Sequence, residues 1–214
     1  MKKDIKYSPV RVVMMLAGIF MIGMCVASYR ISGFGVDAFS CMNLGVSGFL
    51  GMTFGTWQLI VNGVLLVVVW FTVRSCIRLG TIVNMVCVGY TADFLCWLMI
   101  DQAGLTVTLP LQVFFFLVGT LFASMGCACY MAAEMGIAPY DSVAFIITRY
   151  AGEKISFRAA RVMSDLTAVS VGVIFCLIAG NRLWEIIGLG TIVNACVNGP
   201  LIQFFRGKFE KIIK

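Results

Sequence analysis

The chain has 214 residues, of which 61% are hydrophobic and only 12% are charged, and it contains no histidine. A soluble domain carries about 25% charged residues, so this chain has too little polar surface to face water on all sides. We therefore expect it to lie in a lipid bilayer. The net charge of +6 is scattered over the segments between apolar runs, which is not the pattern of a nucleic-acid-binding surface.

Apolar runs of about 17–25 residues are long enough to cross a membrane as helices. The first run is too long for the apolar core of a signal peptide, which is about 7–15 residues, so we expect it to be retained. If the N-terminus is cytoplasmic, every Lys and Arg except Arg30 and Arg182 lies on the cytoplasmic side, as the positive-inside rule requires. Both termini are therefore predicted to be cytoplasmic. The six runs expected to span are 9–28, 57–74, 79–99, 109–131, 160–180 and 186–205.

An internal repeat organises these runs. The hexamer LGTIVN occurs at 79–84 and again at 189–194, and GVDAFS at 35–40 corresponds to GIAPYDS at 136–142. Each half contains a spanning helix, a short segment and two further spanning helices. Because three spans is an odd number, the second half must enter the membrane from the opposite side, a plan that recurs in secondary transporters.

The predicted fold is therefore all-α. We expect one polytopic membrane domain with about six transmembrane helices, arranged as two inverted 3+3 repeats over about 9–100 and 109–206. Asp37 is a good helix N-cap and Pro139 suits a first helical position, so both short segments should begin helices there. Helices over 37–50 and 139–151 are too short to cross about 30 Å of hydrocarbon. They are expected to be re-entrant or interfacial, one near each membrane surface.

The LGTIVN hexamers also look like helix starts. Thr81 and Thr191 are expected to be N-caps, with Asn84 and Asn194 completing a weak capping box. Helix N-termini carry partial positive charge and free N–H groups, which suit an anionic or carbonyl-bearing ligand. The same residues would also serve close helix packing without any ligand, and this alternative stays open.

Ionisable residues inside apolar spans are costly and therefore candidates for function. Asp93 lies in the apolar stretch VGYTADFLCWL, and we expect it to share one cavity near mid-membrane with both LGTIVN helix starts. For Asp93, the alternative is that its side chain snorkels to the outer interface. For Asp165, the alternative to a ligand role is a purely structural pair with Arg161, one helical turn away. The residues expected along a substrate or ion pathway are Asp93, Asp165, Arg161, Asp37, Asp141, Tyr140, Thr81, Asn84, Thr191, Asn194, Asn62 and Asn198.

No metal site, cofactor or catalytic centre is expected. The nine cysteines form no CxxC pair, and histidine is absent as a co-ligand. A GxSxG elbow, a His-based triad and a phosphate-binding P-loop are all missing from the sequence. We therefore expect that the protein is not an enzyme.

Several motifs together resemble a known family. GVDAFS, LGTIVN, APYDS, RVMSD at 161–165 and the closing GLGTIVNACVNGPLIQFF resemble the YczE/YyaS/YitT-like bacterial integral membrane proteins, most of all the YczE-like branch. The resemblance covers about residues 10–206 and departs at Ala38, where members commonly have proline. It implies a multi-spanning protein of the bacterial inner (plasma) membrane, and it implies little about activity.

The functional prediction is a secondary transporter or permease for a small polar solute, anionic solutes included. One alternative is the membrane substrate-binding subunit of a larger importer. Another is an accessory protein of a biosynthetic or export system that transports nothing. The expected partners are the lipid bilayer and a small solute of unknown identity, without nucleic acid, and association between copies of the chain is left open.

Overall fold

All regular secondary structure is helical within the residues that the computed structural model describes. These are 8–151 and 154–213, without the side chains of 158, 185, 189, 193–196, 199, 212 and 213. The helices are α1 Pro9–Ser32, α2 Ala38–Leu50, α3 Phe54–Thr72, α4 Leu79–Cys96, α5 Leu109–Ala133, α6 Pro139–Tyr150, α7 Phe157–Ile178 and α8 Leu189–Ile213. The short elements are η1 Arg74–Cys76, the π-helical turn η2 Trp97–Gln102 that extends α4, and η3 Leu183–Glu185.

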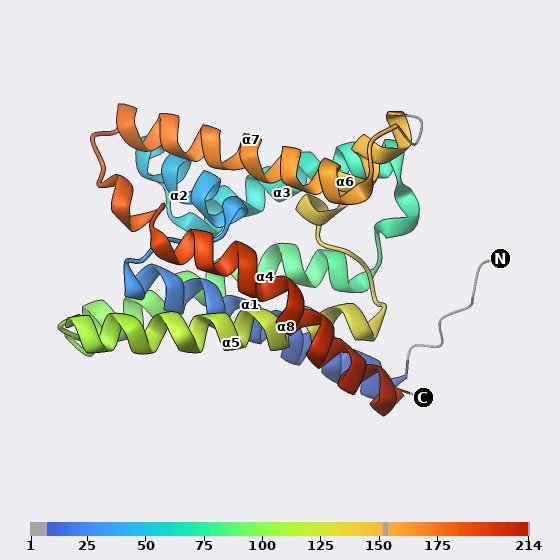
Figure 1. The fold of residues 1–214 in the computed structure, drawn as a ribbon, viewed down its shortest axis with the longest axis horizontal. Helices are drawn as coiled ribbons and strands as arrows, with labels where there is room; N and C mark the ends of the chain where they lie inside the picture. The colour runs from blue at the N-terminus through green and yellow to red at the C-terminus, as the bar shows by residue number, and fades with distance from the viewer. Residues whose placement is uncertain (1–7, 152–153, 214) are drawn as a thin grey trace.

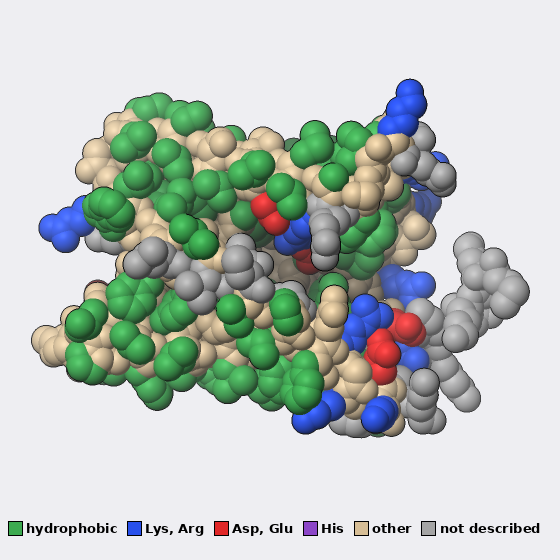
Figure 2. Space-filling view, in the orientation of Figure 1, with side chains coloured by type: hydrophobic (Ala, Val, Ile, Leu, Met, Phe, Trp, Pro, Cys, Tyr) green, Lys and Arg blue, Asp and Glu red, His purple; other side chains and the backbone are tan. Residues whose placement is uncertain are grey.

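Five of the described helices are long and apolar enough to cross a membrane. The sixth expected span, 186–205, falls on α8, where several side chains lie outside the described residues, so its spanning stays a prediction. Large apolar side chains on the flanks, among them Val64, Leu117 and Leu166, are more than half exposed, and Figure 2 shows such side chains over both flanks. Exposed apolar surface of this extent fits contact with lipid. The five helices are Pro9–Ser32, Phe54–Thr72, Leu79–Gln102, Leu109–Ala133 and Ala159–Ile178.

The helices form two layers (Figure 1). Helices α2, α3, α6 and α7 pack together in one layer, here called the short-helix layer. Helices α1, α4, α5 and α8 form the other, here called the long-helix layer, in which α1 packs along both α4 and α5. Contacts between α3 and α4 join the two layers. We call the end where α1 begins and α8 ends the proximal end, and the opposite end the distal end.

The two short helices begin as the sequence predicts. The Asp37 carboxylate accepts hydrogen bonds from the backbone N–H groups of Phe39 and Ser40, both at 3.1 Å, and so caps α2. Pro139 is the first residue of α6. With 13 and 12 residues, the helices are about 20 and 18 Å long. Both are too short to cross the hydrocarbon core.

Their placement differs from the prediction. The rings of Phe39 and Tyr140 stack with 4.4 Å between their centroids, so the N-terminal ends of α2 and α6 meet each other. The expectation that the two helices lie at opposite membrane surfaces is therefore wrong for these ends. The reason is that the segments 33–37 and 134–138 run back from the ends of α1 and α5 to the middle of the molecule (Figure 1).

At the proximal end, the segment between α5 and α6 pairs with the segment that enters α4. The N–H of Gly80 donates to the carbonyl of Met135 at 2.8 Å, and the N–H of Ile137 donates to the carbonyl of Cys76 at 3.1 Å. These bonds satisfy backbone groups at the crossing between the two layers, which would otherwise be costly in an apolar surrounding.

The distal end repeats this pairing with the matching residues of the other half. The N–H of Gly190 donates to the carbonyl of Phe34 at 2.9 Å, and the N–H of Val36 donates to the carbonyl of Ile186 at 3.2 Å. The residue offsets between the two sets are those of the sequence repeat: 101 for the segment before each short helix, and 110 for the segment that enters each hexamer helix. The repeated motifs therefore make repeated contacts.

Glycine is needed at one position of each crossing. Gly35 and Gly136 have φ values of +99° and +125°, a region that side chains other than glycine rarely adopt. A Cβ atom at these positions would also collide with the hydroxyls of Thr191 and Thr81, respectively. The paired glycines of the two motifs thus allow both an unusual backbone turn and a close approach to the hexamer threonine.

The LGTIVN helices start three residues earlier than predicted, because α4 and α8 begin at the leucine of each hexamer. Thr81 and Thr191 are thus third helical residues, and the prediction that they are N-caps is wrong. Each hydroxyl instead accepts a hydrogen bond from a backbone N–H just before its helix, that of Arg78 at 3.2 Å or of Gly188 at 3.3 Å. The threonines stabilise the helix starts from inside the first turn.

Candidate functional site

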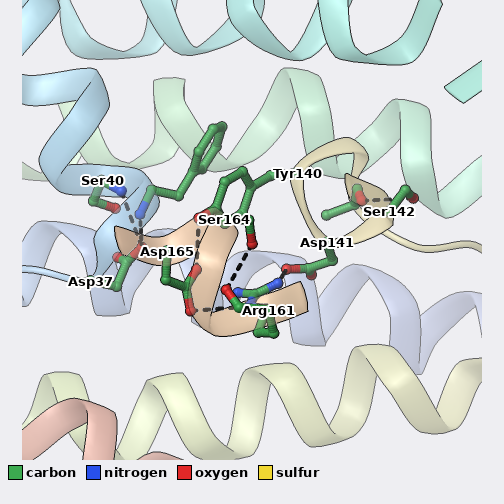
Figure 3. Close-up of polar contacts among 10 residues, drawn as sticks. Asp37, Ser40, Tyr140, Asp141, Ser142, Arg161, Ser164 and Asp165 are labelled. Atoms are coloured by element: carbon green, nitrogen blue, oxygen red, sulfur yellow. Dashed lines mark hydrogen bonds and ion pairs between the residues drawn. The ribbon is translucent and has the colours of Figure 1, made fainter. Parts of the chain in front are cut away.

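The meeting point of α2 and α6 is the polar centre of the short-helix layer. Two helix N-termini face one another across the stacked rings of Phe39 and Tyr140, and each N-terminus contributes about half a positive charge. Charged side chains from α7 join them (Figure 3). We call this set the half-helix junction; its residues are Asp37, Phe39, Ser40, Tyr140, Asp141, Arg161 and Asp165.

Arg161 is the hub of the junction. Its guanidinium donates to the carboxylate of Asp141 on α6 and, at 3.3 Å, to that of Asp165 one turn along α7. It also lies 5.1 Å from the ring centre of Tyr140, a distance at which a cation is attracted to an aromatic face. The predicted pair between Arg161 and Asp165 is therefore present, and it forms part of a larger network that includes α6.

The Tyr140 hydroxyl completes the network by donating to Asp165 at 2.6 Å. Burial and this hydrogen bond to Asp165 raise the pKa of Tyr140 well above its ordinary value of about 10. The phenol therefore stays protonated at physiological pH and acts as a donor to the carboxylate. The junction contains three carboxyl groups and one guanidinium, so the formal charge of Asp37, Asp141, Asp165 and Arg161 together is −2. The two helix N-termini offset about one of these charges.

A second polar set lies on α2 and α3. Asn43, Gln58 and Asn62 are buried, and their side-chain oxygens have no hydrogen-bond partner among the described residues. Gln58 and Asn62 are one turn apart and so share a face of α3. The Gln58 oxygen packs against Gly89 of α4, where the two layers touch. Because an unpaired buried acceptor costs about 1–3 kcal/mol, these oxygens are acceptors available to water or to a polar solute.

Asp93 belongs to a different site, a cavity of about 410 Å³ at the distal end. Its carboxylate pairs with the guanidinium of Arg30 at 2.6 Å and accepts from the N–H of Gly55 at 2.6 Å. These contacts connect α1 and α4 of the long-helix layer to α3 of the short-helix layer. Asp101 and Trp97 also line this cavity, so it combines charged and aromatic walls.

The single cavity expected for Asp93 and both hexamer starts is absent from the described structure. Thr81 is 12 residues before Asp93 on the same helix, a distance of about 18 Å along its axis. Its hydroxyl instead contacts the carbonyl of Ile137, at 2.9 Å. Neither Thr81 nor Thr191 lines the cavity at Asp93. That part of the site prediction is wrong because the threonines serve the two crossings.

The asparagine residues that were predicted to line the pathway lie in several separate parts of the structure. Asn62 is buried on α3, and Asn84 is buried on α4 near its start. Asn198 of α8 accepts a hydrogen bond from the Ser124 hydroxyl at 3.3 Å and so lies between α5 and α8. The side chain of Asn194 lies outside the described residues. No common site for these amides is present in the part of the chain that the structure describes.

Two functional candidates could not be found by local sequence reasoning. Arg30 lies 63 residues from its partner Asp93, and it ends an apolar run like any membrane-edge arginine. Gln58 lies in the apolar stretch of α3, where only Asn62 was expected to be functional. The repeat could have indicated Gln58. When the two halves are aligned so that Asn62 matches Asp165, Gln58 matches Arg161.

Sequence comparison assigns the chain to a family. A family described as a family of unknown function, DUF6198, matches residues 9–207. The chain belongs to the DUF6198 family. The match includes both hexamers, both short helices and the whole half-helix junction.

The similarity of the chain to known proteins is consistent with a membrane location. An uncharacterized membrane protein, YczE of Bacillus subtilis, is 24% identical over 79% of the chain and 73% of its own length. The uncharacterized protein YyaS of the same organism is 24% identical over 91% of both chains. An uncharacterized protein of Haemophilus influenzae is 23% identical over 82% of the chain and 73% of its own length. The expected family resemblance is confirmed. No solved structure matches the chain.

Proposed function

We propose that the protein is a secondary transporter or permease that moves a small polar solute across the bacterial inner membrane, and that it is a carrier and not an enzyme. The observation that carries this proposal is the half-helix junction. Two helices too short to span meet N-terminus to N-terminus, with Arg161, Asp141 and Asp165 between them. Short helices whose ends supply a polar site near mid-membrane are a recurrent feature of transporter binding sites.

We also propose that the chain is a six-span inverted duplication. The paired bonds at the two crossings support it, because each bond at the proximal end has a counterpart at the distal end at the offsets of the repeat. The fold places the beginning of α1 and the end of α8 at the same end (Figure 1), which fits an even number of spans. On the positive-inside rule, we propose that the proximal end, where α1 begins and α8 ends, faces the cytoplasm.

The proposed mechanism is movement of the short-helix layer against the long-helix layer. The junction belongs wholly to the short-helix layer, so a solute bound there would move with it. The Gly55–Asp93 hydrogen bond connects the two layers at the distal end, and the Arg30–Asp93 pair holds the Asp93 carboxylate from α1. These contacts support a state closed on the distal side, and opening on that side would require them to separate.

The residues of the junction can accept several chemical groups. Helix N-termini and Arg161 attract an anionic group, and the carboxylates of Asp141 and Asp165 attract a cationic group or a proton. The buried oxygens of Gln58 and Asn62 can accept hydrogen bonds. A small solute with both donors and acceptors would satisfy this set, which is why we propose a polar solute as the class.

Uptake into proteoliposomes tests the proposal. The purified protein should accumulate at least one member of a panel of small polar solutes in a saturable manner, and Asp165→Asn should lower that uptake at least about tenfold. Glu210→Gln is the matched control, since Glu210 also pairs with an arginine four residues away but lies outside the junction. Uptake that is equal in Asp165→Asn and wild-type protein would contradict a role for the junction. Copurification of an ATPase with the protein would favour the importer-subunit alternative.

A further inference from the structure

A second pocket, separate from the junction and from the distal cavity, lies at the proximal end. It has a volume of about 510 Å³ and is lined by Val73, Phe145, Thr148, Arg149 and Phe157. These residues come from the end of α3, the last part of α6 and the start of α7. The volume lies within the range of about 300–1,000 Å³ of small-molecule sites. We call it the proximal pocket.

The helices beside the pocket, α6 and α3, lack the glycine contact that joins their counterparts α2 and α7. Gly45 of α2 and Gly172 of α7 let those two backbones touch, since a Cβ on either would collide with the other helix. In the repeat, the corresponding positions on α6 and α3 are Ile146 and Val69. These larger side chains do not permit the backbone contact that the two glycines allow.

The walls of the pocket are apolar and partly exposed. The rings of Phe145 and Phe157 lie 4.6 Å apart between centroids, and both side chains have more than a third of their surface exposed. Val73 adds a third apolar wall. A surface of this kind at the flank of a membrane helix bundle suits an acyl chain, because the lipid hydrocarbon is the only abundant apolar partner there.

The polar wall is cationic. Arg149 is exposed and uses one N–H for the carbonyl of Thr72, which leaves further donors of its guanidinium for a phosphate. Neither Arg149 nor the nearby Arg74 and Lys154 pairs with a carboxylate among the described residues. Among the described residues, basic side chains without an acidic partner therefore lie next to an apolar pocket at this corner.

Aromatic side chains indicate that the pocket lies at headgroup depth. Trp70 and Tyr150 are exposed near the proximal ends of α3 and α6, and tryptophan and tyrosine favour the membrane–water interface. The guanidinium of Arg74 lies 3.7 Å from the Trp70 ring centre. Basic pockets between membrane helices at this depth bind anionic lipid headgroups.

We propose that the proximal pocket binds one anionic phospholipid, with its phosphate on Arg149 and its acyl chains against Phe145 and Phe157. The charge of the corner selects an anionic headgroup over a zwitterionic one, because the latter also brings a cation to an already cationic surface. The bound lipid would hold the C-terminal part of α6 beside α3 and α7. This inference stands whether or not the protein transports a solute.

Native mass spectrometry of the delipidated protein tests the proposal. Phosphatidylglycerol and phosphatidylcholine with the same acyl chains are titrated separately, and wild-type protein should bind the first at least about fivefold more tightly, as expected for about 1 kcal/mol per basic residue. Arg149→Gln should remove most of this preference. Arg182→Gln, at the distal end, should keep it. Equal binding of the two lipids by wild-type protein, or an unchanged preference in Arg149→Gln, would overturn the proposal.

A second measurement separates a lipid from a free phosphate ion. Inorganic phosphate at millimolar concentration should leave phosphatidylglycerol bound, because the acyl chains contribute contacts that the ion lacks. Phe145→Ser should weaken phosphatidylglycerol binding while Arg149 is still present. If inorganic phosphate displaces the lipid fully, or if Phe145→Ser binds it as wild-type protein does, the pocket holds a phosphate group alone and the lipid proposal is wrong.

Discussion

Replacing Arg161 by methionine is the sharpest perturbation of the half-helix junction. The substitution keeps an unbranched side chain of similar length and removes the only described cation between Asp141 and Asp165. Two carboxylates would then lie close to one another without a counter-charge. We expect the folded protein to lose stability, because removing one partner of a shielded charge network leaves the other partners uncompensated.

The magnitude follows from how shielded the network is. The side chains of Arg161, Asp141 and Asp165 have 36%, 39% and 35% of their surface exposed, respectively. The network is thus intermediate between an exposed ion pair and a fully buried one. An exposed pair contributes up to about 1 kcal/mol, and removing one partner of a buried pair costs about 3–5 kcal/mol. The expected loss for Arg161→Met is therefore about 2 kcal/mol. For a chain of this size, this corresponds to a fall in Tm of about 4–8 °C.

Thermal unfolding in detergent measures this loss. A dye that reacts with cysteine reports unfolding here, because Cys25, Cys41 and Cys176 are buried in the folded protein. Arg206→Met is the matched control, since Arg206 also pairs with a carboxylate four residues away but both partners are about half exposed. That change should cost at most about 0.5 kcal/mol.

The neutral triple variant Arg161→Met, Asp141→Asn, Asp165→Asn separates charge from packing. It should regain part of the Tm lost by the single variant, because no uncompensated carboxylate is left. The electrostatic reasoning would be refuted if Arg161→Met lowered the Tm no more than Arg206→Met does, or if the triple variant were less stable than the single one.

Three further outcomes are expected. Tyr140→Phe should lower the free energy of unfolding by about 1 kcal/mol, because it removes the hydrogen bond to Asp165. Burial and this hydrogen bond raise the pKa of Tyr140 in the folded protein. The difference in Tm between wild-type protein and Tyr140→Phe should therefore persist below about pH 9 and shrink as pH rises beyond about 10. Gly45→Ala should lower the Tm, at a cost of about 1–3 kcal/mol in stability, because its Cβ would collide with α7. Gly63→Ala is the control and should leave the Tm unchanged, because a Cβ there meets open space. Equal shifts of Tm in the two variants would contradict the packing of α2 on α7. Asp93→Asn should loosen the distal cavity and speed labelling of Cys96 by a water-soluble maleimide; an unchanged rate would contradict the role of this carboxylate in closure.

The starts of the short helices could be predicted because they depend on adjacent residues. Asp37 caps α2 through N–H groups two and three residues ahead, and Pro139 fixes the first residue of α6 by its own ring. Helix lengths followed from the positions of the apolar runs. The prediction for Thr81 failed at the same scale, since a threonine can serve a helix start as the N-cap or as the third residue, and the hexamer does not distinguish them.

The contacts between distant segments could not be predicted in the same way. The repeat indicated that the halves correspond, but it did not indicate that the starts of α2 and α6 meet and stack through Phe39 and Tyr140. The pairing of Asp93 with Arg30 depends on how α1 lies against α4, which no local pattern specifies. Asp141 was expected along the pathway but without a named partner, because its bond to Arg161 depends on the packing of α6 on α7.

The most direct test of the central claim is whether the half-helix junction can be reached from both sides of the membrane. Ser40 lies in the junction at the start of α2 and is buried in this structure. A single cysteine at this position, in a background from which the nine native cysteines have been removed, is treated with a small membrane-impermeant thiol reagent in intact cells and in inside-out vesicles. A carrier with its site at the junction predicts labelling from each side, at rates that change together in the Asp93→Asn background. Labelling from one side only, or from neither, would contradict the proposed transport site.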